Sequence, residues 1–138
     1  MSDAPGWQRR AMAATYLARV AEAFENAACD IQTAEITLCL IRMAAPYRAA
    51  TGLLANPSID ASGTATMYLA MAMEALQGGG LSDEIAAVAV FAEVLSGFGY
   101  SEGHPKVAAD EDWINTTGSA MVTELTALAK YLKLNGGF

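Results

Sequence analysis

Few residues in this chain are of types that do chemistry, and the only histidine is His104. Nucleophilic catalysis requires a nucleophile held beside such a base, and the sequence places none next to His104. We therefore favour a structural role for this histidine over a catalytic one. An active site, were there one, would belong to the glycine-rich loop around it, whose candidate residues are Gly97, Gly99, Tyr100 and His104. We predict that the chain is not an enzyme.

The two cysteines, Cys29 and Cys39, are ten residues apart in segments that we expect to be helical. They form no CxxC motif, and neither has a basic neighbour that would activate it as a nucleophile. The first residues of the chain lack the apolar segment of a secretory signal. We therefore predict two buried free thiols in a reducing compartment, and hence a cytoplasmic location.

Metal and phosphate sites are not indicated either. A di-iron bundle needs a Glu-x-x-His motif on two helices, whereas the nearest match, Glu22-x-x-Glu25, lacks the histidine. Asp110-x-Asp112 begins like a calcium-binding loop, but the residues after it do not continue the ligand pattern. Three glycines at 78–80 precede a helix, yet no lysine follows them and two acids occupy the first turn, which disfavours a phosphate. We predict no metal and no cofactor.

Charge and composition bear on the partners. The net charge is −7, so we expect neither nucleic acid nor an anionic membrane surface as a partner. No stretch reaches eighteen uncharged apolar residues, and we therefore predict no membrane span. The alanine-rich chain is 54% hydrophobic and only 17% charged, well below the usual quarter. One small bundle has too few buried positions for so many apolar residues, so we expect a partner surface, most simply another copy of the chain.

The elements that must position any site are helices, and the most apolar long one is expected over 30–56, with Asp30 as its N-cap. Because its residues are apolar nearly all round, we predict a central helix covered by neighbours. Pro46 should kink or restart it. Residues 36–41 are rich in β-branched side chains and are compatible with a buried strand, but the flanking alanines favour a helix.

The remaining segments are predicted to pack around that helix. Four-residue spacing of apolar side chains indicates a helix over 7–28, after a flexible tail over 1–6. Further helices are expected from 59 or 62 to 77, from Ser82 as N-cap, and from 110 to 134 with a possible break at Gly118. The glycines at 78–80 are expected to form a flexible linker. The whole chain, 1–138, is thus predicted to be one all-α domain, an antiparallel bundle of four to five helices.

The leading functional hypothesis is a non-enzymatic interaction or assembly protein: a homo-oligomer, or a subunit, adaptor or inhibitor that acts through apolar helix faces and an acidic surface. The alternative is a bundle that binds a small apolar ligand or cofactor. Flexible methionines and aromatic side chains suit either an interface or a pocket. The candidate residues for this role are Met67, Met71, Phe91, Trp113 and Met121.

Overall fold

The computed structural model describes residues 3–29, 34–56, 62–96 and 111–135. They form five α-helices: α1 (Asp3–Cys29), α2 (Ala34–Ala55), α3 (Ser62–Gln77), α4 (Ser82–Ser96) and α5 (Glu111–Asn135). Within these ranges the chain has no strand, so the predicted all-α bundle is confirmed. Residues 36–41 belong to α2, which rules out the alternative of a strand there.

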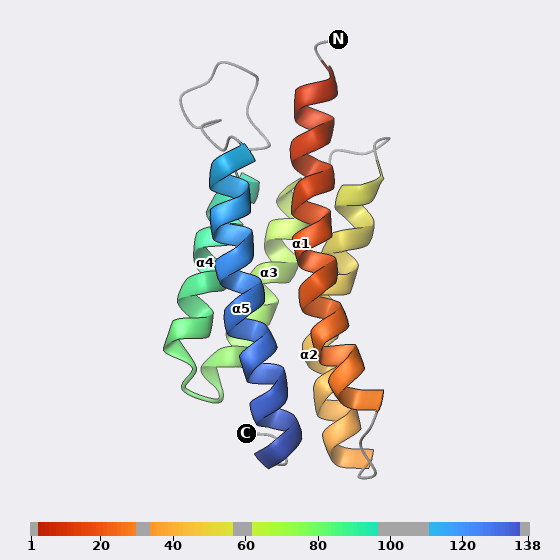
Figure 1. The fold of residues 1–138 in the computed structure, drawn as a ribbon, viewed down its shortest axis with the longest axis vertical. Coiled ribbons are helices and arrows are strands. Elements are labelled where there is room, and N and C mark those ends of the chain that lie inside the picture. Colours follow the sequence, from red (N-terminus) through yellow and green to blue (C-terminus); the bar gives the residue numbers. More distant parts are fainter. Residues whose placement is uncertain (1–2, 30–33, 57–61, 97–110, 136–138) are drawn as a thin grey trace.

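The helices form an elongated bundle in which each packs against the next along the chain. Contacts between α1 and α5 close the ring, and α2 also touches α5. Figure 1 shows α1 and α5 side by side at the front of the bundle, with α3 behind them. The predicted antiparallel order stays a prediction.

The core is built from the helical stripes that the sequence predicts. On α1, Leu17, Val20 and Phe24 are fully buried because their spacing places them on one side of the helix. Phe24 stacks on Tyr47 of α2, with ring centroids 6.1 Å apart. The helix begins at Asp3, so the predicted tail over 1–6 is too long. Proline is tolerated in this first turn, where backbone N–H groups have no intrahelical acceptor.

Contrary to prediction, α2 is not covered on all sides. Leu40, Met43 and Tyr47 face the core, whereas Leu38 and Ile41 are exposed. The helix packs mainly between α1 and α3, so its outer side has no neighbour among the described residues. It runs through Pro46 as one helix and does not restart there. The kink at Pro46 stays a prediction, and Asp30 lies outside the described residues.

The connection from α3 to α4 is an ordered turn, so the prediction of a flexible glycine linker is wrong. The N–H of Leu81 donates to the carbonyl of Leu76 at 3.4 Å, and that of Gly80 donates to the carbonyl of Gln77 at 3.1 Å. Gly80 has a φ of +68°. This is the Schellman pattern, in which the backbone closes the end of a helix. Leu81 then accepts from Ile85, so Leu81 rather than Ser82 holds the N-cap position of α4.

Gly118 does not break α5, which continues to Asn135. The glycine instead makes room for a side chain of α1. A Cβ on Gly118 would lie within 3 Å of several Tyr16 ring atoms. The Tyr16 hydroxyl donates to Asn115 Oδ1 at 2.6 Å, and its ring meets that of Phe91 edge to face. Because Gly118 has no side chain, the Tyr16 ring of α1 lies against the backbone of α5 and also contacts Phe91 of α4.

Candidate functional site

The five predicted interaction residues fall into two groups. Met67, Met71 and Trp113 are exposed, as an interface requires. Phe91 and Met121 are fully buried in the core, so they do not belong to an exposed interaction surface. Both lie at core-facing positions of their helices, and a residue type alone does not reveal which neighbour will cover it. The predicted loop residues Gly97, Gly99, Tyr100 and His104 lie outside the described residues.

The cysteine prediction is wrong in part. Cys29 is exposed at the end of α1, and Cys39 is half-buried on α2. Cys29 is the last residue of its helix. Both are free thiols, as predicted.

One exposed apolar surface lies on α3, and we define the α3 face as Met67, Met71 and Glu74. These residues are four and three positions apart, which places them on one side of the helix. The opposite side is anchored by Leu69, Ala72 and Leu76, all buried. Glu74 is the single charged residue of this 16-residue helix, so its outward side is unusually poor in charge.

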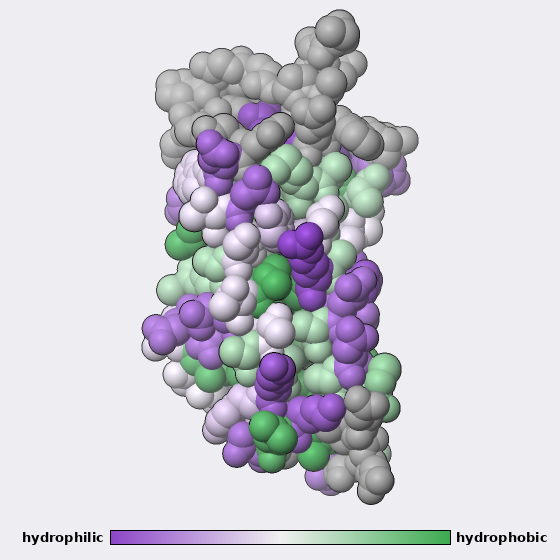
Figure 2. All heavy atoms as spheres, in the orientation of Figure 1, coloured by the Kyte–Doolittle hydropathy of each residue, from purple (hydrophilic) through white to green (hydrophobic). Residues whose placement is uncertain are grey.

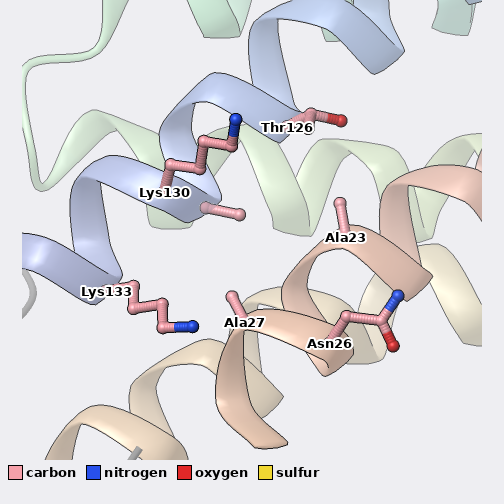
Figure 3. A pocket seen from close by; sticks show the side chains of 7 residues that line it. Ala23, Asn26, Ala27, Thr126, Lys130 and Lys133 are labelled. Carbon is pink, nitrogen blue, oxygen red and sulfur yellow. The ribbon is translucent and has the colours of Figure 1, made fainter. Parts of the chain in front are cut away.

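A second feature is a groove of about 310 Å³ between α1 and α5. Figure 3 shows Ala23 and Ala27 on α1, facing Thr126, Lys130 and Lys133 on α5. We define the α1–α5 groove by its lining residues: Ala23, Asn26, Ala27, Thr126, Ala129, Lys130 and Lys133. Three alanines make its floor small and apolar, and its two basic residues, Lys130 and Lys133, belong to the last two turns of α5. Figure 2 shows hydrophobic residues interrupting the hydrophilic ones along this side of the bundle.

The α1–α5 groove could not be predicted from the sequence because it needs two helices that are far apart in the chain. A partial signal was present: Thr126, Lys130 and Lys133 recur at helical spacing on one side of α5. A smaller groove of about 240 Å³ lies between α4 and α5 and is lined by Glu84, Glu124 and Tyr131 among others. Tyr131 is exposed at this groove. None of the five predicted interaction residues lines either groove.

Two arginines tie α1 to α2. Arg48 Nη2 lies 2.6 Å from Glu25 Oε1 in an ion pair. This hydrogen-bonded contact raises the pKa of Arg48. Arg10 Nη2 donates to the carbonyl of Asn56 at 2.9 Å and to that of Leu53 at 3.4 Å, where α2 ends with carbonyls that lack helical partners. Both arginines thus act in holding helices together.

Among the residues that the structure describes, no three His, Cys, Asp or Glu side chains gather as metal ligands would. Within the same described ranges, the helices are all too short or too polar to cross a bilayer.

Comparisons with protein-family models, curated proteins and solved structures found no significant match to this chain.

Proposed function

We propose that the chain is a non-enzymatic helical assembly protein that binds further copies of itself through exposed apolar helix faces. The observation that carries the proposal is the α3 face. Met67 is 59% exposed and Met71 54% exposed, although both are large and apolar. A helix at the surface of a globular protein usually turns charged residues to solvent. The α3 face instead offers two flexible methionines, side chains that adapt to a partner's surface.

The neighbouring helix supports the same proposal. Leu38 and Ile41 are exposed on α2, which packs beside α3. Exposed apolar side chains on adjoining helices are typical of interaction surfaces. A second copy is the simplest partner because most soluble oligomers consist of identical chains. The net charge of −7 disfavours nucleic acid as a partner.

The test is the mass of the protein in solution, measured by light scattering after size-exclusion chromatography across the micromolar range. We expect masses above the 14.4 kDa of one chain, rising with protein concentration. Met71→Lys places a charge in the α3 face and should return the mass to that of a monomer. Val90→Lys introduces the same charge at an exposed apolar position of α4 and should leave the mass unchanged.

Circular dichroism of each variant checks that the helices are retained. A wild-type chain that stays monomeric at every concentration contradicts the proposal. An unchanged mass for Met71→Lys contradicts the role of the α3 face.

A further inference from the structure

We propose that the α3 face of one copy docks into the α1–α5 groove of a second copy. This inference rests on the proposed self-assembly and names the two surfaces that meet. Two large side chains, Met67 and Met71, would fill a groove whose floor consists of alanines. One acid, Glu74, would reach the end of the groove that carries Lys130 and Lys133.

The charges of the two surfaces are complementary. The sequence has three lysines; Lys106 lies outside the described residues, and Lys130 and Lys133 both line the groove. The groove is therefore a basic surface on a chain whose net charge is −7. The α3 face carries one acid and no base. Opposite charges favour this contact and give it a register, because the reverse orientation would move Glu74 away from the lysines.

The lengths of the two surfaces also agree. Met67 and Glu74 are seven residues apart, as are Thr126 and Lys133. In a helix that separation is two turns, or about 10 Å. Figure 1 shows that α1 and α5 run in the same direction, since the sequence colours of both advance downwards. An α3 helix laid parallel to them places Met67 near Ala23 and Thr126, Met71 near Ala27, and Glu74 at the lysines.

The alanines let a helix approach the groove closely. Ala23 and Ala27 are four residues apart on α1, so they form one small-residue strip beside Ala129 of α5. Long side chains of a third helix would pack into such a strip as ridges into a groove. The methionines of the α3 face are flexible enough to fill an irregular space of this size.

The two surfaces lie on opposite sides of the molecule. α3 packs against α2 and α4, and Figure 1 shows it behind the pair α1 and α5. A copy that receives α3 in its groove still presents its own α3 face at the back. The contact is therefore head to tail, and copies add on until a ring closes or a filament grows.

The first experiment exchanges the charges. Glu74→Lys and Lys130→Glu should each weaken self-association by about threefold to tenfold, because each puts like charges in contact. The double variant Glu74→Lys, Lys130→Glu should return the association constant to near the wild-type value, as measured by sedimentation velocity. Glu93→Lys makes the same charge change at an exposed site of α4 and should have no effect.

The second experiment mixes two variants that are each blocked on one surface. Met71→Lys disables the α3 face, and Ala27→Glu fills the groove and neutralises a lysine there. Each variant alone should be monomeric, whereas their equimolar mixture should form dimers that grow no further, because one working contact remains. A contact between two α3 faces would instead leave Ala27→Glu self-associating on its own, and the mixture would contain no mixed complex because Met71→Lys has lost that face.

The outcomes separate this inference from the proposed function. If the wild type assembles but the charge exchange fails to restore association and the mixture forms no mixed complex, this docking is wrong and the proposed self-assembly stands. If the wild type is monomeric throughout, both are wrong. A wild type that is monomeric alone and binds only an unrelated helix overturns the choice of a second copy as occupant.

Discussion

Tyr47 is fully buried, and its hydroxyl has no hydrogen-bond partner among the residues that the structure describes. The ring contributes to the core by stacking on Phe24. The hydroxyl, by contrast, has lost its contact with water without gaining an acceptor, which lowers stability. Burial also raises the pKa of this hydroxyl, because the phenolate form is disfavoured in an apolar surrounding.

We expect Tyr47→Phe to raise the free energy of unfolding by about 1 kcal/mol at neutral pH, because it removes an unsatisfied polar group and keeps the ring. In the wild type the folded-state pKa lies above the unfolded value, so stability is lost as the pH rises past about 10. The advantage of the variant should therefore grow in alkali. Urea unfolding at several pH values measures this, with exposed Tyr131→Phe as control. A loss of stability in Tyr47→Phe would contradict it.

Gly118 is the second residue whose role depends on one contact. Replacing an exposed helical glycine by alanine ordinarily stabilises a protein by up to about 1 kcal/mol. At Gly118 the added Cβ would collide with the Tyr16 ring, so the ring must shift. We expect the overpacking, about 1–3 kcal/mol, to outweigh that gain.

Gly118→Ala should therefore lower the midpoint of urea unfolding. Gly52→Ala is the matched control, because Gly52 is helical and a Cβ there meets nothing within 4 Å. It should raise the midpoint. Equal increases in both variants would show that Tyr16 does not press on Gly118.

At the scale of elements, the turn between α3 and α4 determines how α4 packs back against α3. Only Gly80 of its three glycines is described with a positive φ. Alanine in that left-handed conformation costs about 1–2 kcal/mol. Gly80→Ala should thus destabilise the protein by about that amount in thermal or urea unfolding.

Gly78→Ala is the control for the same turn. Its Cβ would meet the carbonyl oxygen of Ala75 at 3.5 Å, an ordinary contact. We expect its unfolding midpoint to be unchanged or slightly higher, since alanine restricts the unfolded chain. If both variants behaved alike, the turn would not depend on the conformation of Gly80.

At the scale of the whole molecule, the distribution of exposed apolar residues determines which surfaces can take part in self-association. The outward sides of α2 and α3 carry Leu38, Ile41, Met67 and Met71. Head-to-tail contact predicts that the average mass keeps rising with concentration instead of levelling off at a dimer. Light scattering over a dilution series distinguishes these outcomes, and a plateau at two chains would favour a contact between identical surfaces.

Much of the fold follows from the sequence because helical periodicity is a local property. Four-residue spacing of apolar side chains was enough to predict the helix over 7–28, which lies within α1. The end of α3 at Gln77 follows from the glycines after it. The same glycines also suggested a flexible linker, which is wrong, because whether backbone groups pair across a turn depends on where the chain goes next.

Local pattern determined the helices and the side of each that is most apolar. Only the tertiary structure decided which apolar sides are covered: Phe91 and Met121 are buried, while Leu38, Met67 and Tyr131 are exposed. The α1–α5 groove likewise exists only because Ala27 and Lys130, about a hundred residues apart, are brought together. The physical reason is that burial depends on the neighbours a helix acquires, and periodicity within one helix carries no information about them.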